Sequence, residues 1–219
     1  MDLDAGQVYV VLYTGPVLRP YRETDRAALF DVCVRTGYLG GDAGGRYGDD
    51  DLLPSIFLAP YLDLEPDLAF VVDDGERAVG YVVGTADTEE FVRRFRAEYL
   101  PTVADRFPAP SDPPVTETDG MLALLHQPEH MLHPVFAGHP AHLHIDLLPD
   151  HQRRGFGRAL MSRFLATLAD RGVTGVHLSM VTANTGARPF YDRLGFAELP
   201  LADPVVTHLA RSTEPLGDH

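Results

Sequence analysis

The sequence predicts an α/β domain, of the α+β kind, with a mixed central sheet, and three observations lead to this prediction. Short β-rich runs alternate with segments of helical periodicity along most of the 219 residues. The chain is 45% hydrophobic, which is enough for one globular domain with a sizeable core. No segment is repeated, and no apolar run approaches the length of a membrane span. We therefore expect a single domain over residues 1–211 and a flexible tail at 212–219.

The first half of the chain contains a helix and a hairpin as its clearest elements. Thr24 and Asp25 are suitable N-caps for a helix over residues 26–35. Asp73, Asp74 and Gly75 form a turn signal between two β-rich runs, which predicts a hairpin over residues 68–86. The other segments of this half are predicted as a strand at 7–13, a loop at 36–51, a helix at 51–58 and a connection at 60–66.

The middle of the chain is expected to contain helices around a long loop. A helix is predicted near residues 88–99, and Pro101 ends it. Residues 101–120 include five prolines, which favours an exposed loop. A short helix at 121–133 follows and leads into the next strand.

The C-terminal third has the most regular patterns. Residues 141–148 alternate in polarity, which predicts a strand with His142, His144 and Asp146 on one face. Residues 157–171 have helical spacing, and Gly172 is a suitable stop. The remaining core elements are predicted as strands at 175–181, 196–199 and 205–209 and a helix at 184–194 that ends before Gly195.

Composition narrows the function and the compartment. The net charge is −14, which argues against a general nucleic-acid binder because such proteins neutralise phosphates. All 18 basic residues apart from histidine are arginine, so catalysis by lysine is excluded. Cys33 is the single cysteine, and we expect a small buried hydrophobic residue rather than a disulfide partner. The acidic N-terminus does not resemble a secretory signal, so the expected compartment is the cytoplasm.

A glycine-rich turn stands between the strand at 141–148 and the helix at 157–171. Its sequence is QRRGFG, from Gln152 to Gly157. The first turn of a helix has N–H groups without intrahelical partners, and glycine lets an anion approach them. Arg153 and Arg154 add positive charge, so the turn suits a pyrophosphate. The pattern matches neither a GK[ST] phosphate loop nor a GxGxxG fingerprint, and alone it is equally typical of a glycine-rich turn with two solvated arginines.

The sequence after this turn resembles a known superfamily. Over about residues 140–200, the order and spacing of elements resemble those of GCN5-related N-acetyltransferases (GNAT). The elements are a strand, QRRGFG, a helix, a second strand and NTGARPFYDRLGF (184–196). RPYRETDRAALFDVC (19–33) resembles the first strand and helix of such enzymes. Four further segments are similar to bacterial acetyltransferases that resemble the C-terminal acetyltransferase-like region of O-GlcNAcase. They are GYLGGDAG, APYLDLEPDLAFVVDD, GYVVGTADTEEF and EYLP. The resemblance implies a sheet of about seven strands with helices on both faces and an inserted region at about 87–139.

The resemblance also implies acetyl-CoA as co-substrate, in an opening between the strands that end near Leu148 and Val181. The pantetheine arm would pair with the backbone at the end of the first strand, and the pyrophosphate would lie on the amides of the turn. Tyr191 matches a tyrosine that protonates the departing thiolate, although it could instead pack on the sheet. An ordinary phenol, of pKa about 10, suits donation to a thiolate of pKa about 8.5. The implied cofactor residues are Leu147, Leu148, Gln152, Arg153, Arg154, Gly155, Phe156, Gly157, Arg158 and Asn184.

The implied reaction is direct transfer of the acetyl group to an amine, which must first lose its extra proton. Asp146 is the first candidate for the base, because it lies nearest the strand end, and His144 and His142 share its face. These three side chains could alternatively bind a metal, but no zinc-site spacing is present, and we expect none. The candidate acceptor-wall residues are Tyr38, Asp42, Tyr47, Asp87 and Thr88.

Two further questions stay open at the level of sequence. An acyl-CoA-binding module without catalysis is an alternative to an enzyme. The identity of the amine, a small molecule or a protein, and the oligomeric state, a monomer or a homodimer, are not encoded in any motif of the chain.

Overall fold

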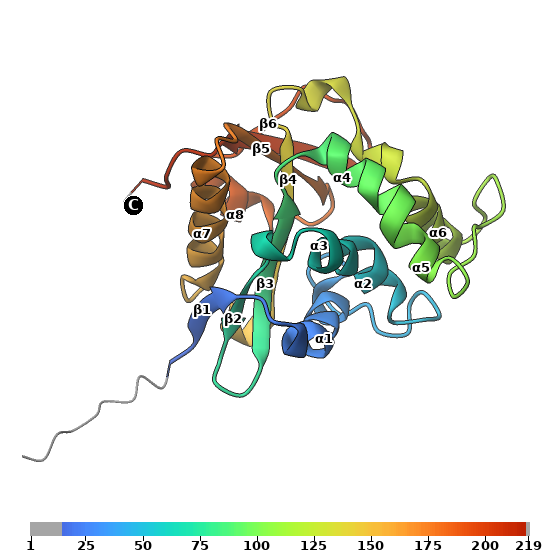
Figure 1. Cartoon of the computed structure of the whole chain (residues 1–219), viewed down its shortest axis with the longest axis horizontal. Helices are drawn as coiled ribbons and strands as arrows, with labels where there is room; N and C mark the ends of the chain where they lie inside the picture. The colour runs from blue at the N-terminus through green and yellow to red at the C-terminus, as the bar shows by residue number, and fades with distance from the viewer. Residues whose placement is uncertain (1–14, 218–219) are drawn as a thin grey trace, which may run out of the picture.

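A single mixed sheet organises the molecule. The computed structural model describes residues 15–217, and within them seven strands form a sheet in the order β1-β2-β3-β4-β5-β7-β6 (Figure 1). Every neighbouring pair is antiparallel except β4 and β5. The strands are β1 (Val17–Pro20), β2 (Phe70–Asp73), β3 (Ala78–Thr85), β4 (Ala141–Leu147), β5 (Gly175–Val181), β6 (Ala197–Glu198) and β7 (Val206–Ser212). The predicted fold class is confirmed, and the strand predicted at 7–13 lies outside the described residues.

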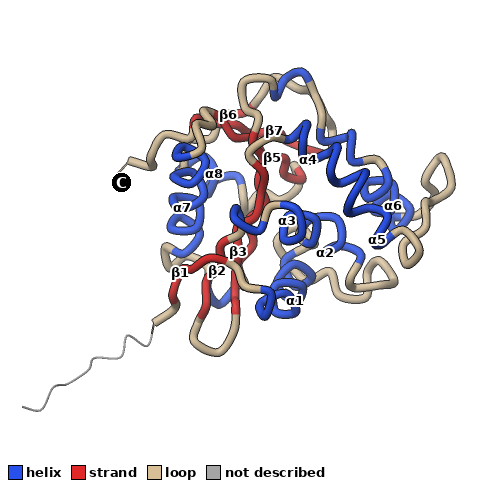
Figure 2. The backbone as a smooth tube through the Cα atoms, in the orientation of Figure 1, coloured by secondary structure: helices blue, strands red, loops and turns tan. Residues whose placement is uncertain are grey.

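Helices cover both faces of the sheet. Helix α7 packs on β1 to β4 from one side, while α1 packs on β3 and β4 from the other (Figures 1 and 2). The α-helices are α1 (Arg26–Thr36), α2 (Leu52–Phe57), α3 (Ala59–Leu64), α4 (Thr88–Arg94), α5 (Leu100–Val103), α6 (Glu117–His126), α7 (Phe156–Asp170) and α8 (Arg188–Arg193). A π-helical turn spans Phe95–Tyr99, and 3₁₀ turns lie at Glu23–Asp25, Pro66–Leu68, Pro128–Met131, Pro134–Phe136 and Pro149–His151.

The strongest sequence patterns are confirmed. The hairpin of β2 and β3 turns at Gly75, whose φ of 99° requires glycine. Helix α7 buries Leu160 and Phe164 completely against the sheet, and burial of each such side chain contributes about 1.5–3 kcal/mol. Gly172, with φ of 75°, ends that helix. Cys33 is buried in α1 and unpaired, as predicted.

The helical layer on the α1 side differs from the prediction at three places. Residues 60–66 were predicted as a connection, yet Ala59–Leu64 form α3, because Pro60 occupies the first turn, where its missing N–H is not needed. The helix expected to end before Pro101 continues to Val103, since a π turn precedes the proline and puts it in the first turn of α5. Helix α6 begins at Glu117 rather than at 121, because Thr116 and Asp119 form a capping box.

The C-terminal elements also differ in extent. Helix α8 starts at Arg188, four residues later than predicted, because residues 182–187 form turns. Strand β7 continues to Ser212. Thr213 is buried, and its hydroxyl donates to the Val173 carbonyl at 2.6 Å, so the chain stays packed beyond the predicted start of a flexible tail. Leu216 is partly buried against the core.

Candidate active site

The sheet opens between β4 and β5, the parallel pair. Backbone pairing joins Ala141 and His142 to β5, and no pair follows, although β4 continues to Leu147 and β5 to Val181. The two strands therefore diverge over most of their length and leave an opening at their carboxyl ends. In open α/β sheets, ligands bind outside the carboxyl ends of such strands.

Strand β4 points backbone groups into this opening. Residues of an antiparallel pair direct their N–H and C=O groups alternately to one side and the other. The Leu148 N–H donates to the Val79 carbonyl at 3.0 Å, and the Leu148 carbonyl accepts from His151 at 2.9 Å. The groups of Ile145 and Leu147 therefore point away from β3. Leu147 and Ile145 therefore present backbone groups on the side of the opening, where the Leu147 carbonyl accepts from the Gln152 side chain, whereas both backbone groups of Leu148 are bonded within the chain.

The conformation of the turn after β4 depends on one side-chain hydrogen bond and on two residues with positive φ. The Gln152 side-chain amide donates to the Leu147 carbonyl at 2.9 Å and holds the strand end. The φ angles of Arg153 and Gly155 are 58° and 87°, so the chain passes twice through the left-handed region. A Cβ added at Gly155 would meet no atom within 4 Å, so the φ angle rather than space selects glycine there. Arg153 and Arg154 are exposed, and neither is in an ion pair within residues 15–217.

Helix α7 presents an uncapped N-terminus to the opening. Gly155 is the N-cap and has no side chain that could bond the first turn. The Ala159 N–H makes the first intrahelical bond, to the Gly155 carbonyl at 3.0 Å. The N–H groups of Phe156, Gly157 and Arg158 therefore have no intrahelical acceptor. With the dipole of a 15-residue helix behind them, they form a site suited to an anion.

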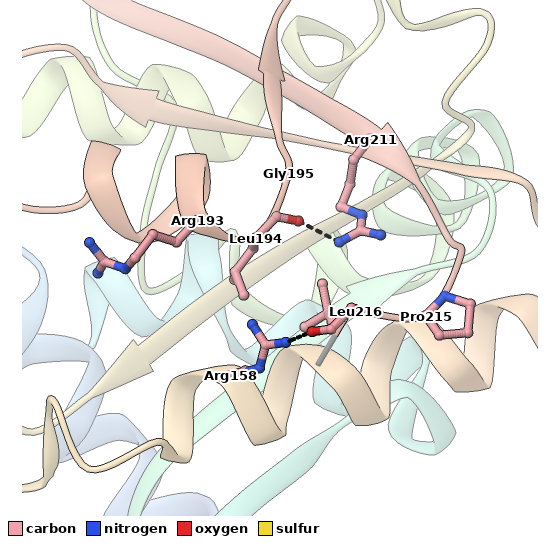
Figure 3. Close-up of a pocket in the computed structure, with 8 residues that line it drawn as sticks. Arg158, Arg193, Leu194, Gly195, Arg211, Pro215 and Leu216 are labelled. Atoms are coloured by element: carbon pink, nitrogen blue, oxygen red, sulfur yellow. Dashed lines mark hydrogen bonds between the residues drawn. The ribbon is translucent and has the colours of Figure 1, made fainter. Parts of the chain in front are cut away.

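Two predicted cofactor residues have contacts that the sequence did not indicate. A Cβ on Gly157 would lie 3.1 Å from the Phe190 ring, so this glycine allows close packing between α7 and the helix that carries Phe190. The Arg158 guanidinium donates to the Gly217 carbonyl beside a hollow of about 200 Å³, where Arg211 also donates to backbone carbonyls (Figure 3). The Arg158 side chain therefore points to the C-terminal segment, while its backbone amide lies in the first turn of α7.

Asp146 lies in a polar enclosure between β4, β3 and α1. The Tyr81 hydroxyl donates to Asp146 Oδ2 at 2.7 Å. Desolvation raises the pKa of Asp146 above its ordinary value, and hydrogen bonds from Tyr81 and Thr36 oppose part of that rise. A raised pKa brings a carboxylate closer to the range in which a general base works. The geometry is therefore compatible with Asp146 as the base.

Tyr191 reaches the same region from α8. Its ring packs at 5.2 Å from the Phe190 ring and 5.6 Å from the Phe196 ring, and 9% of the residue is exposed. The hydroxyl makes no hydrogen bond to another described residue. Burial, and then the charge of Asp146, raise the Tyr191 pKa above the ordinary 10. The hydroxyl therefore stays protonated at neutral pH and can donate a hydrogen bond, but it is a weaker acid than an ordinary phenol.

His142 and His144 are bonded to the helical layer. The Tyr61 hydroxyl lies 2.8 Å from His142 Nε2 and 3.1 Å from His144 Nε2. Thr88 Oγ1 lies 2.8 Å from His142 Nδ1 and donates to the Pro140 carbonyl at 2.7 Å. Burial lowers the pKa of His144 to about 4 and that of His142 well below its ordinary value, so both rings are neutral at neutral pH.

Two of the predicted acceptor-wall residues make hydrogen bonds that support the start of α4 and the ring of His142. Asp87 is the N-cap of α4, and its carboxylate accepts from the N–H groups of Glu89 and Glu90. Thr88 is buried, and its hydroxyl donates to the Pro140 carbonyl and contacts the His142 ring. Both helix N–H groups bond Asp87 Oδ1, so Oδ2 of this exposed residue has no bond to another described residue, whereas the Thr88 hydroxyl is enclosed.

The other three acceptor candidates lie in the loop that approaches the opening. Tyr38 is 39% exposed and closes a tight turn with Gly41 through reciprocal backbone bonds. A Cβ added at Gly40 would lie 3.8 Å from the Asn184 side chain, so this turn lies beside the end of β5. Asp42 is exposed and accepts from the Gly44 N–H, whereas Tyr47 is buried. Gly40 and Asn184 are thus brought together next to the end of β5.

The part of the chain that the structure describes holds neither a metal site nor a membrane helix. Among residues 15–217, no group of three histidine, cysteine or carboxylate side chains is placed to hold a metal ion. In the same residues, no helix is both long enough and apolar enough to cross a membrane.

Fold and site together define an α/β domain with an opening between two diverging parallel strands and an uncapped helix N-terminus after the first of them. Comparison with known families gives the same class. Residues 42–196 match the Acetyltransferase (GNAT) family, and the chain therefore belongs to that family.

Individual relatives extend this assignment. The chain is 23% identical over 184 residues to Protein O-GlcNAcase of Mus musculus; the match covers 83% of this chain and 20% of that protein, so the chain spans about a fifth of the relative's length. The crystal structure of SsHAT is 58% identical, with a TM-score of 0.88 over 91% of this chain and 98% of that one. A PaiA N-acetyltransferase from Thermoplasma acidophilum, solved in complex with coenzyme A, shares the fold at 12% identity, with a TM-score of 0.54 over 90% and 99% of the chains.

Sequence reasoning missed two tyrosines that support the β4 side chains. Tyr81 was part of a predicted strand, and its pairing with Asp146 depends on the β3–β4 register. Tyr61 was part of a predicted connection, and its contacts with two histidines depend on the placement of α3 over β4. For Tyr81, the only local signal was its place in a predicted strand, where a tyrosine more often packs in the core than takes part in catalysis.

Proposed function

We propose that this chain is an N-acetyltransferase that uses acetyl-CoA and transfers its acetyl group directly to an amine. The single observation that supports this most strongly is the divergence of β4 and β5 in front of the uncapped N-terminus of α7. Such an opening accepts an extended pantetheine arm along β4, and the helix N-terminus accepts a pyrophosphate. Membership of the GNAT family supports the same cofactor.

Under this proposal, individual residues have separate roles in acetyl transfer. A neutral amine attacks the thioester carbonyl, the C–N bond forms, and the C–S bond of the tetrahedral intermediate breaks. Asp146 takes one proton from the nitrogen, directly or through a water, and Tyr191 gives its proton to the departing thiolate. The backbone groups of Ile145 and Leu147 hold the cofactor arm. Asn184 contacts the same arm from the end of β5.

The acceptor enters beside the turn of Tyr38 to Gly41. This turn lies against Asn184, and its tyrosine is partly exposed, with the Arg46 guanidinium over one face of the ring at 3.7 Å from its centre. Asp42 follows it in the loop and is exposed to solvent. We therefore expect the acceptor side chain or ligand body to lie on Tyr38.

Release of free thiol from acetyl-CoA, measured across a panel of alkylamines, polyamines and peptide N-termini, tests the proposal. We expect amine-dependent thiol release and binding of acetyl-CoA in calorimetry. Asp146→Asn should keep the binding and lose the transfer, because the cofactor contacts are backbone groups. Binding without transfer to any amine would instead indicate an acyl-CoA-binding domain, and no binding at all would overturn the assignment of the opening.

A further inference from the structure

A chain of hydrogen bonds runs from β4 into the helical layer and ends at His144. Its members are the Pro140 carbonyl, the Thr88 hydroxyl, the His142 ring, the Tyr61 hydroxyl and the His144 ring. Tyr61 is 1% exposed and His142 is 5% exposed, so no water competes for the inner bonds. The Tyr61 hydroxyl also lies 3.9 Å from the Met131 sulfur, a weak acceptor that does not compete with the His142 ring at 2.8 Å. Buried polar networks whose members are all satisfied are rigid.

The direction of every proton in this chain follows from its first link. The Pro140 carbonyl can only accept, so the single Thr88 proton points to it across 2.7 Å. The Thr88 oxygen must then accept from His142 Nδ1–H at 2.8 Å. A neutral His142 has its one proton on Nδ1, so its Nε2 accepts the Tyr61 proton at 2.8 Å.

The last link fixes the tautomer of His144. The Tyr61 proton is already donated to His142, so the Tyr61 oxygen can only accept at 3.1 Å from His144 Nε2. His144 therefore carries its proton on Nε2, and its Nδ1 has a free lone pair. This nitrogen makes no hydrogen bond to another described residue and is not among the fully enclosed side-chain atoms, so it is accessible to solvent. His144 itself lies two residues beyond the last β4–β5 pair, alongside the opening.

We propose that Tyr61, Thr88 and His142 are positioning residues that hold His144 as the Nε2–H tautomer, so that Nδ1 accepts a hydrogen bond from the acceptor amine. This inference rests on the proposed acetyl transfer. The chain of hydrogen bonds ends at the Pro140 carbonyl, which has no proton to pass on. Its function is therefore to hold a tautomer rather than to conduct protons. The weak basicity of His144 fits this role, since no proton is transferred to it.

The proposal specifies the class of amine. His144 and Asp146 are alternate residues on one face of β4, about 7 Å apart along the strand. A nucleophilic nitrogen between them gives one N–H proton to Asp146 and keeps a second N–H on His144 Nδ1 while its lone pair attacks the carbonyl. A neutral primary amine has both N–H groups, whereas a secondary amine has one. An unpaired lone pair on His144 would then disfavour the secondary amine by about tenfold or more.

Nuclear magnetic resonance reads the tautomer without any turnover. Long-range proton–nitrogen spectra of the uniformly labelled protein distinguish Nδ1–H from Nε2–H rings, and His144→Gln and His142→Gln assign the two signals. We expect Nε2–H for His144 and Nδ1–H for His142, in the protein with or without acetyl-CoA. Nδ1–H at His144 would overturn the proposal, whether or not the enzyme turns over.

Matched variants test the consequence for transfer. Tyr61→Phe removes the central hydroxyl, and Tyr99→Phe is the control, since it removes another buried tyrosine hydroxyl, which donates to the Ser55 carbonyl at 2.8 Å. We expect Tyr61→Phe to lower kcat about tenfold or more, to leave the KM for acetyl-CoA within twofold, and to reduce the preference for a primary amine over its N-methyl form. Thr88→Ser should retain activity and Thr88→Val should lose it.

The outcomes separate this inference from the proposed function. Equal kinetics for Tyr61→Phe and Tyr99→Phe, or equal rates for the primary amine and its N-methyl form in the unaltered enzyme, would overturn the positioning role while acetyl transfer stands. Absence of transfer to every amine overturns the proposed function, and the tautomer spectra then still decide whether the chain of hydrogen bonds holds His144 as inferred.

Discussion

Replacement of Tyr81 by phenylalanine should raise the pKa of Asp146 and move the acidic limb of the pH–rate profile upward. The Tyr81 hydroxyl donates to Asp146 Oδ2 at 2.7 Å, inside an enclosure where burial already raises the pKa of this carboxyl. The other groups that face Asp146 are Thr36 and Cys33 from α1 and Tyr191 from α8. None of them replaces the lost donor, because a phenylalanine ring occupies the same space.

The size of the shift follows from the bond that is lost. A hydrogen bond to a charged acceptor stabilises it by about 1.5–3 kcal/mol, and one pKa unit corresponds to about 1.4 kcal/mol. The protonated acid would also accept a bond from Tyr81, so part of the energy cancels between the two states. We therefore expect a rise of about one unit. At a pH below the new value the base is protonated, and the rate falls there but not at high pH.

Two measurements check this prediction. The pH dependence of kcat/KM gives the acidic limb of the free enzyme, and carbon spectra of the labelled Asp146 carboxyl give its titration without turnover. Tyr99→Phe serves as the control for loss of a buried tyrosine hydroxyl elsewhere in the helical layer. An unchanged or lowered Asp146 pKa in Tyr81→Phe would refute the electrostatic argument. A raised pKa with an unmoved acidic limb would exclude Asp146 as the base.

The remaining predictions concern the acid, the anion site and the acid sensitivity of the fold. Tyr191→Phe should lower kcat by about 100-fold in steady-state kinetics while calorimetry shows unchanged acetyl-CoA binding. Arg153→Ala with Arg154→Ala should weaken acetyl-CoA binding about tenfold, since each exposed charge about 6 Å from a pyrophosphate contributes about 0.6 kcal/mol after screening. Urea unfolding should show stability lost as the pH falls from about 6.5 to 4, by up to about 3 kcal/mol each for His144 and His177, whose pKa values burial lowers to about 4.

Each of these has a contrary outcome. A Tyr191→Phe enzyme with full kcat would reduce the tyrosine to packing against its aromatic neighbours. For the arginine pair, the loss of affinity should shrink in high salt, and a loss that does not depend on salt would show that the two positive charges do not attract the pyrophosphate. For the histidines, the fold favours the neutral ring, so the stabilisation is present above pH 6.5. His177→Gln should reduce the dependence of the unfolding free energy on pH between 6.5 and 4, and an unchanged dependence would contradict a lowered pKa of His177.

The periodic elements could be predicted from the sequence because their causes are local. Alternation along β4, the apolar face of α7 and the turn at Gly75 each depend on residues a few positions apart, and the structure contains all three. The QRRGFG turn was identified for the same reason, since a φ-demanding glycine and an uncapped helix start lie within a few residues of one another. Local signals failed where prolines were taken as helix ends, although they stand in first turns.

The roles of single side chains depended on tertiary structure. The sequence did not indicate that Asp87 caps α4 or that the buried Thr88 hydroxyl bonds Pro140. The sequence shows a β4 face with two histidines and an aspartate; it does not show which of them are bonded to Tyr81 or Tyr61. Those tyrosines come from 65 and 83 residues earlier in the chain, and only the strand register and the placement of α3 bring them within hydrogen-bond distance.

The sequence by itself therefore determined the fold class, the family and the glycine-rich turn before α7, because each is encoded in contiguous residues. The tertiary structure decided where the strands diverge, which backbone groups of β4 face the opening, and which hydroxyl groups contact the β4 histidines. These properties depend on directions of hydrogen bonds between segments far apart in sequence. A hydrogen bond is made or lost within a fraction of an ångström, and residue identity along the chain does not set that distance.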